Sequence, residues 1–114
     1  MNYKWSIFMV DLNPVIGSEQ QGRRPVLIIS NETTNSVMPV ITILPITSLK
    51  KGRRIYPNEA LLKKDMAGLE SDSIVLAHQI RTISKQRLTT CTGEISDSKI
   101  QSQINEALRV HLNL

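Results

Sequence analysis

The apolar residues of the chain gather in short runs that are separated by polar, glycine-bearing or proline-bearing segments. Four of these runs are rich in isoleucine and valine and are bounded by Gly, Pro, Asn or Ser: residues 7–12, 25–30, 37–46 and 74–80. Short β-branched runs with such boundaries are typical of strands. Weaker strands are expected at 53–62, where Pro57 favours an edge or interrupted strand, and at 88–95. The pattern therefore predicts a mainly β protein, built as a small barrel or sandwich.

The last part of the chain has a different period. Ile100, Ile104 and Leu108 recur every four residues, and polar side chains occupy the positions between them. This spacing predicts an amphipathic C-terminal helix. A short side-chain oxygen at Ser96 or Asp97 is expected to cap its first turn by accepting from the free backbone amides there.

The composition is that of an ordinary globular protein, with 114 residues of which 40% are hydrophobic and 21% charged. Because no repeat, low-complexity segment or linker divides the chain, we expect one domain over residues 1–114. We find no apolar run of bilayer length and no secretory signal, so a cytoplasmic protein is expected. Cys91 is the only cysteine, and His78 and His111 lie far apart. Neither a disulfide framework nor a metal site is therefore predicted.

Charge changes this picture, because the chain carries a formal net charge of +4 and favours anionic partners such as nucleic acid. Eight of its fourteen basic residues lie within one stretch: Arg23, Arg24, Lys50, Lys51, Arg53, Arg54, Lys63 and Lys64. Clusters of this kind suit phosphate binding, although a solvated surface loop is the alternative. The polar segment at 13–24 holds two of these arginines, a carboxylate and three amides. Loops of this composition often carry function.

Three motifs occur in order along the chain: "VDLNPVIGSEQQGRRPVLIIS" at 10–30, "PITS" at 45–48 and "DSIVLAHQIRTISKQRL" at 72–88. Together they resemble the successive motifs of the MazF/PemK family of toxin endoribonucleases. The resemblance implies an SH3-like small barrel of the CcdB/PemK type with short helices, acting as a homodimer without a cofactor. It also implies a toxin that cuts single-stranded RNA at short sequences without a metal, inhibits translation and growth, and is held in check by an antitoxin.

Metal-free cleavage by the 2′-hydroxyl of RNA needs a proton acceptor, a proton donor and positive charge near the phosphate. Arg24 falls on the catalytic arginine of the family, and its planar guanidinium can hold two phosphate oxygens. Thr47, in "PITS", falls on the catalytic threonine, and its hydroxyl can donate to a phosphate oxygen. Glu19 matches the loop pattern, where three roles stay open: orienting Arg24, accepting a proton, or shaping the loop.

His78 departs from the resemblance, because many relatives carry a carboxylate at this position, before the Gln of "QIRTI". A histidine ordinarily titrates near pH ~6.5 and can take and return a proton at neutral pH. We therefore predict that His78 is a general acid or base beside Arg24 and Thr47. The alternative is a half-buried histidine whose ring is satisfied by a backbone carbonyl.

Several further residues are predicted to contact RNA. Those in the matched motifs or the basic stretch are Gln20, Arg23, Lys50, Lys51, Arg53, Arg54 and Gln79, and Tyr56 is expected to stack on a base.

Trp5 and Ser6 stand where the family often has a glycine and an acid. Trp5 is expected to pack in the barrel or at a subunit interface, with stacking on a base as the alternative.

The basic groove is also expected to bind a cognate antitoxin through an acidic, disordered C-terminal segment. Two other functions stay open at this point. One is a homologue that binds RNA or antitoxin without cutting, which the departures at Trp5, Ser6 and His78 make conceivable. The other is a gyrase poison like CcdB, which shares the fold. A tryptophan close to the C-terminus matters in that family, whereas this chain ends "RVHLNL".

Overall fold

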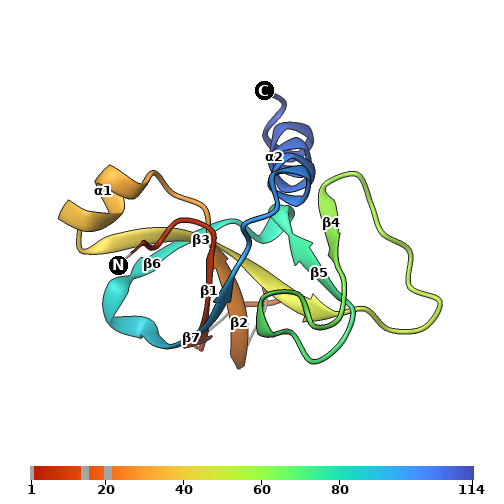
Figure 1. Ribbon diagram of the computed structural model, residues 1–114, viewed down its shortest axis with the longest axis horizontal. Coiled ribbons are helices and arrows are strands. Elements are labelled where there is room, and N and C mark those ends of the chain that lie inside the picture. Colours follow the sequence, from red (N-terminus) through yellow and green to blue (C-terminus); the bar gives the residue numbers. More distant parts are fainter. Residues whose placement is uncertain (1, 14–15, 20–21) are drawn as a thin grey trace.

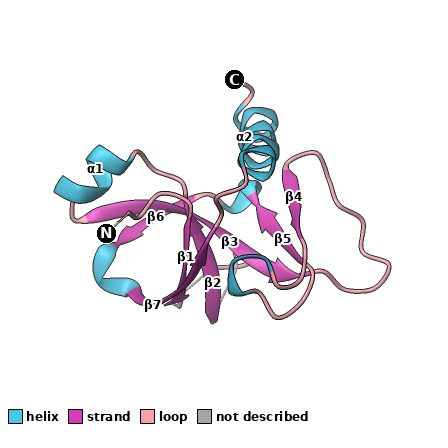
Figure 2. Cartoon of the chain, viewed as in Figure 1, coloured by secondary structure: helices cyan, strands magenta, loops and turns pink. Residues whose placement is uncertain are grey.

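The structure of the protein is a computed structural model that describes residues 2–13, 16–19 and 22–114. Within these residues, seven strands form an antiparallel sheet with helices around it (Figure 1, Figure 2). The strands are β1 (Ser6–Asp11), β2 (Arg23–Ile28), β3 (Val40–Ser48), β4 (Glu59–Leu62), β5 (Ser73–Leu76), β6 (Arg81–Ser84) and β7 (Leu88–Glu94). The helical segments are α1 (Glu32–Val37), α2 (Ser98–Leu112) and the 3₁₀ turns η1 (Met66–Gly68), η2 (Ala77–Gln79) and η3 (Lys85–Arg87).

Strand β3 connects the two halves of the sheet. Its first residues, 40–43, pair with β6, whereas its last residues, 46–48, pair with β5. On its other side, residues 43–45 pair with β2, and the strand order is β4-β5-β3-β2-β1-β7. The predicted mainly β fold with a C-terminal helix is therefore confirmed.

The buried side chains form two clusters on the two faces of β1 and β2. Ile7 and Leu27 point into one cluster, and Phe8, Val26 and Ile28 point into the other. Successive side chains of a strand point to opposite faces, so a strand that is buried on both faces reads as a continuous apolar run. This double burial explains why these segments lack hydrophobic and polar alternation.

Helix α2 packs against β4 and η2 through the apolar side that the sequence predicts. Ile104 and Ala107 are buried in the first cluster, and Ile100 and Leu108 pack against it. The side chain of Asp97 accepts from the backbone N–H of Lys99 at 2.8 Å, which confirms one of the two predicted caps. No helix in the described part of the chain has the length and hydrophobicity needed to cross a membrane.

The predicted strands differ from the observed ones mainly at their ends. The segment 53–62 forms a strand only over its last four residues, and Pro57 lies in the turn before β4. The segment 74–80 is interrupted, since β5 ends at Leu76 and the turn η2 follows. The short elements α1 and β6 were not predicted. Helix α1 has the polar sequence ETTNSV and is held at its start by the side chain of Asn31, so hydrophobic periodicity does not reveal it.

Trp5 enters β1 in an unusual backbone conformation. Its φ is 72°, in the left-handed region that favours glycine. The N–H of Trp5 donates to the carbonyl of Ile28 at 2.8 Å, and its own carbonyl accepts from Ile95 at 2.8 Å. The ring packs against the first apolar cluster, as expected. These contacts hold a non-glycine residue in a conformation that costs on the order of 1 kcal/mol.

The turn η1 lies in close contact with β7 at two glycines. A Cβ at Gly93 would sit 2.4 Å from the backbone oxygen of Ala67. We therefore expect Gly93→Ala to lower the free energy of unfolding by about 1 to 3 kcal/mol, because the added methyl forces the two backbones apart. Urea unfolding measures this change. Thr90→Ser, at an exposed position of the same strand, is the control and should stay within about 0.5 kcal/mol of the parent. Equal stability of the two variants would contradict the expectation.

Candidate active site

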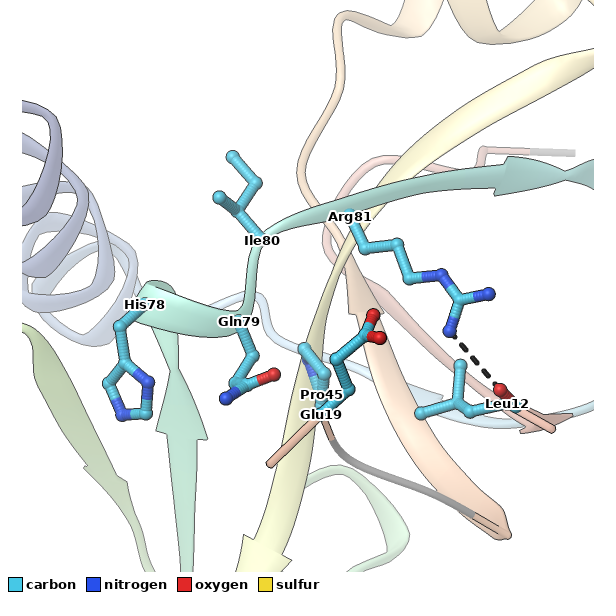
Figure 3. A pocket seen from close by; sticks show the side chains of 7 residues that line it. All are labelled: Leu12, Glu19, Pro45, His78, Gln79, Ile80 and Arg81. Atoms are coloured by element: carbon cyan, nitrogen blue, oxygen red, sulfur yellow. Dashed lines mark hydrogen bonds between the residues drawn. The ribbon is translucent and has the colours of Figure 1, made fainter. Parts of the chain in front are cut away.

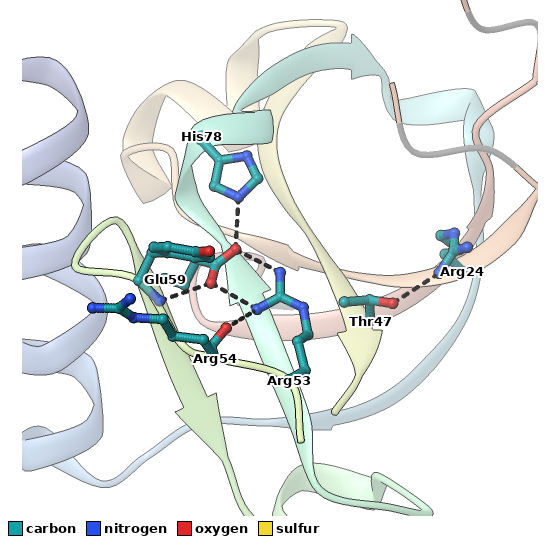
Figure 4. A network of polar contacts seen from close by, with 7 residues as sticks. Arg24, Thr47, Arg53, Arg54, Glu59 and His78 are labelled. Carbon is teal, nitrogen blue, oxygen red and sulfur yellow. Dashed lines mark hydrogen bonds and ion pairs between the residues drawn. The ribbon is translucent and has the colours of Figure 1, made fainter. Parts of the chain in front are cut away.

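Arg24 and Thr47 meet across two neighbouring strands. Strands β2 and β3 pair with Val26 opposite Pro45, and the same register two residues further places Arg24 opposite Thr47. Nη1 of Arg24 donates to Oγ1 of Thr47 at 3.3 Å (Figure 4). Both residues are half-buried. The structure thus brings together the two residues that fall on the catalytic arginine and threonine of the resemblance.

A pocket of about 280 Å³ lies at Pro45, two residues before Thr47 on β3 (Figure 3). It is lined by Leu12, Glu19, Pro45, His78, Gln79, Ile80 and Arg81. Pro45 and Thr47 are two residues apart on β3 and therefore face the same side of the sheet. One wall is fixed by Arg81, whose Nη1 donates to the carbonyl of Leu12 at 3.2 Å. The pocket therefore extends the surface that carries Arg24 and Thr47.

Glu19 reaches this pocket from the loop that precedes β2 (Figure 3). Its Oε1 accepts from the backbone N–H of Ile16 at 2.8 Å, so the carboxylate shapes its own loop. This contact fits the predicted role of Glu19 in shaping the loop. It does not exclude that Glu19 also accepts a proton, because its carboxylate has further lone pairs. Gln20, another predicted RNA contact, lies outside the described residues.

A second polar cluster surrounds Glu59 at the start of β4 (Figure 4). The side chain of Glu59 is only 1% exposed. Arg53 donates to both of its oxygens, Nη1 to Oε1 at 2.9 Å and Nη2 to Oε2 at 2.8 Å. The backbone N–H of Tyr56 donates to Oε1 at 3.0 Å, and Nε2 of His78 lies 2.8 Å from Oε2. Sequence reasoning missed Glu59, which no motif marks.

The charge of Glu59 follows from these contacts. The hydrogen bonds from Arg53, with help from the Tyr56 amide and His78, outweigh the effect of burial and lower the pKa of Glu59 to about 2. The same pairing raises the pKa of Arg53. Glu59 is therefore ionised at neutral pH and can only accept hydrogen bonds, so Nε2 of His78 must be the donor.

Acid is expected to destabilise the fold through Glu59. Its folded pKa of about 2 lies below the ordinary value of 4.5, so its stabilisation is complete above the ordinary pKa and is lost as the pH falls toward about 2. At about 1.36 kcal/mol per pKa unit, the loss between about pH 5 and pH 2 is about 3 kcal/mol. Urea unfolding across this range measures it, and Glu59→Gln should remove this part of the pH dependence.

Glu106 provides the matched control for that experiment. Its carboxylate also pairs with an arginine, Arg109, but at 3.5 Å and with the Glu106 side chain 66% exposed. Exposed pairs contribute little, so Glu106→Gln should leave the acid dependence unchanged. A Glu59→Gln protein that loses stability in acid as steeply as the parent would contradict the assignment to Glu59.

The structure does not bring His78 to Arg24 and Thr47. Thr47 lies opposite Ile74 on β5, and His78 follows four residues later in η2. With a rise of about 3.3 Å per strand residue, the backbones of Thr47 and His78 lie on the order of 10 Å apart. Figure 4 shows the imidazole directed at Glu59, whereas Arg24 and Thr47 lie apart from it. A proton-transfer role for His78 stays a prediction, and its ring partner is a carboxylate rather than a backbone carbonyl.

The remaining predicted RNA contacts lie mostly on the surface. Five of these side chains are exposed: Arg23, Lys50, Lys51, Arg54 and Tyr56. Their contacts with RNA stay predictions. The guanidinium of Arg54 lies over the ring of Tyr56 at 5.6 Å. Gln79 is half-buried in the pocket wall. Arg53 is engaged by Glu59, so the structure gives it an internal contact that the sequence does not reveal. Among the described residues, no group of three or more His, Cys, Asp or Glu side chains is arranged to hold a metal.

Comparisons with known proteins agree with this geometry. A family model described as "PemK-like, MazF-like toxin of type II toxin-antitoxin system" matches residues 3–112. Endoribonuclease MazF9 of Mycobacterium tuberculosis is 36% identical, covering 100% of this chain and 98% of the relative. Endoribonuclease EndoA of Bacillus subtilis is 38% identical, covering 95% of this chain and 91% of the relative.

Solved structures share the fold. MazF from Deinococcus radiodurans is 27% identical, with a TM-score of 0.80 over 97% of this chain and 96% of the neighbour. A mycobacterial endoribonuclease in complex with its cognate antitoxin has a TM-score of 0.81 over 100% and 97%, and at 24% identity it supports the fold alone. Fold and site thus define a small β toxin of the type II toxin-antitoxin class. The chain belongs to the PemK/MazF toxin family.

Proposed function

We propose that this protein is a sequence-specific, metal-independent endoribonuclease that cuts single-stranded RNA as the toxin of a toxin-antitoxin system. Its action would inhibit translation and growth. The observation that carries the proposal is the contact between Arg24 and Thr47, at the positions that fall on the catalytic residues of the family. The curated relatives named as endoribonucleases support the reaction class.

In the proposed reaction, the 2′-oxygen of one nucleotide attacks its own 3′-phosphorus while the bond from phosphorus to the next 5′-oxygen breaks. The products are a 2′,3′-cyclic phosphate and a 5′-hydroxyl. Arg24 and Thr47 would donate hydrogen bonds to the phosphate oxygens, where negative charge builds up. Glu19, over the same face of β3, would accept the proton of the 2′-hydroxyl. The leaving 5′-oxygen would take its proton from solvent water, with Arg24 as a secondary candidate donor.

The pocket beside this pair would receive a neighbouring nucleotide. Gln79 offers an amide that can both donate and accept hydrogen bonds, which suits the edge of a base. The exposed residues Arg23, Lys50, Lys51 and Arg54 would bind phosphates, and Tyr56 would stack on a base. RNA would then run from Arg24 past the pocket toward the cluster around Glu59.

The partners of this site are also proposals. We propose a homodimer that acts in the cytoplasm, where RNA is available, and that residues 1–114 form a single toxin domain. A cognate antitoxin with an acidic, disordered C-terminal segment would cover the basic surface. The solved mycobacterial neighbour in complex with its cognate antitoxin supports such a partner.

One experiment tests the function directly. Pure protein is incubated with long mixed-sequence RNA in the presence of EDTA, and the ends of the fragments are mapped. We expect discrete cuts with 5′-hydroxyl ends, which an identically purified Arg24→Ala protein fails to produce. RNA retention without cuts would instead indicate a non-cleaving binder, and trapping of gyrase on DNA would indicate a gyrase poison. Either of these results would overturn the proposal.

A further inference from the structure

Among the described residues, Glu59 is the charged residue that is buried. A side chain that is 1% exposed keeps its charge at a considerable cost in solvation, unless several partners compensate. Glu59 has such partners on two separate segments. Arg53 and Tyr56 belong to the basic loop before β4, and His78 belongs to the turn η2 at the pocket. One buried carboxylate therefore ties the predicted RNA-binding loop to the pocket wall.

Glu59 reaches His78 through the pairing of two neighbouring strands. Glu59 lies opposite Leu76 in the pairing of β4 with β5, so it stands next to the turn that carries His78. Its Oε2 is 2.8 Å from Nε2 of His78. The carboxylate that binds the imidazole thus comes from the strand next to the one that leads into η2.

The contact also determines which nitrogen His78 offers to a ligand. An ionised carboxylate only accepts, so the proton of the neutral imidazole is held on Nε2 and Nδ1 is left as the acceptor. The side chain of His78 is 29% exposed, and it lines the pocket together with Gln79 (Figure 3). Four charged or titratable groups surround the His78 ring. Glu59 on β4 contacts it, and Arg53 lies behind Glu59. The ring centroid of His111 on α2 is 6.4 Å from that of His78, and Glu19 lines the same pocket.

We propose that Glu59 is a positioning residue of the RNA site, which orients His78 toward the pocket and fixes the basic loop through Arg53. This inference rests on the proposed function for its kinetic consequences. Because His78 lies apart from Arg24 and Thr47, the expected effect concerns RNA binding and the choice of cut sites more than the bond-breaking step.

Exchange of the two residues tests the proposal. Glu59→His alone removes the carboxylate that pairs with Arg53, and His78→Glu alone places two carboxylates against each other. Each single variant should lower kcat/KM at least about tenfold, mostly through KM, and should alter the relative use of the cut sites. The double variant Glu59→His/His78→Glu restores the histidine–carboxylate contact but not the Glu59 oxygens that bind Arg53. It should therefore recover part of the lost kcat/KM and exceed both single variants.

Urea unfolding of all variants separates a loss of folding from a loss of positioning, since only folded proteins enter the kinetic comparison. Glu106→Gln, which removes an exposed arginine-paired carboxylate on α2, is the control and should match the parent. Affinity for single-stranded RNA is measured on the same exchange in an Arg24→Ala background, where cleavage should be about 10²- to 10³-fold slower. A parent that fails to cut RNA would count against the proposed function, and the affinities would still test the positioning. A double variant no better than its worse single variant, in both assays, would overturn the inference.

Discussion

Arg24→Ala should lower the rate of RNA cleavage by about 10²- to 10³-fold, because removal of one donor aimed at developing negative charge has an effect of this size. Arg24 is the residue whose Nη1 contacts Thr47 at 3.3 Å, on the surface that continues into the pocket. Arg24→Lys keeps the charge but loses the planar fork of the guanidinium. It should therefore recover only a small part of the rate. Single-turnover cleavage of an RNA that spans one mapped cut site measures both variants.

Arg23→Ala is the matched control, since it removes a guanidinium one residue earlier on β2 whose side chain is exposed. Arg23 is predicted to contact a phosphate, so this variant should weaken RNA binding and reduce its salt dependence, with the bond-breaking step little changed. Cleavage by Arg24→Ala at the parent rate would refute the assignment of Arg24 to the scissile phosphate. Equal effects of the two variants on the bond-breaking step would also refute it.

Glu19→Gln should lower the cleavage rate by about 10²-fold, the lower end of what a positioned general base contributes. The amide oxygen of glutamine can still accept from the N–H of Ile16, which Glu19 binds at 2.8 Å, so the loop should keep its shape. The substitution therefore separates proton transfer from loop shaping, two of the three roles open to Glu19.

The measurement is the single-turnover rate as a function of pH, compared with Glu19→Ala. The alanine variant removes the acceptor for Ile16 as well and should lose RNA affinity in addition to rate. A Glu19→Gln protein that cuts as fast as the parent, beside a slow Glu19→Ala protein, would restrict Glu19 to shaping the loop. The proton acceptor would then have to be another group.

Much of the fold could be predicted from the sequence, because its strands are dense in β-branched residues and its last helix has a strict period. The segments 25–30 and 37–46 lead to β2 and β3 within a few residues, and Asp97 caps α2 as expected. The Arg24 and Thr47 pair followed from motifs, and the register of β2 with β3 explains physically why they meet. Short polar elements such as α1 carry no comparable hydrophobic signal.

The Glu59 cluster could not be predicted in the same way. Glu59 is separated from His78 by 19 residues, and only the pairing of β4 with β5 brings the two side chains together. Strand pairing of this kind depends on tertiary contacts that a single sequence does not display. Arg53 therefore looked like one more cation of a basic loop. The sequence offers one weak signal for this ion pair. A glutamate begins a short apolar segment, and an arginine stands six residues before it.

The packing of Trp5 has a practical consequence for experiments on this protein. Trp5 is the only tryptophan of the chain, and its indole is held against the first apolar cluster, next to a pocket lined by Glu32, Glu94 and Gln101 rather than by the proposed RNA contacts. Its fluorescence emission should therefore report the opening of the barrel and stay insensitive to RNA bound at Arg24. The molecule carries an intrinsic optical probe of unfolding that is separate from its proposed site.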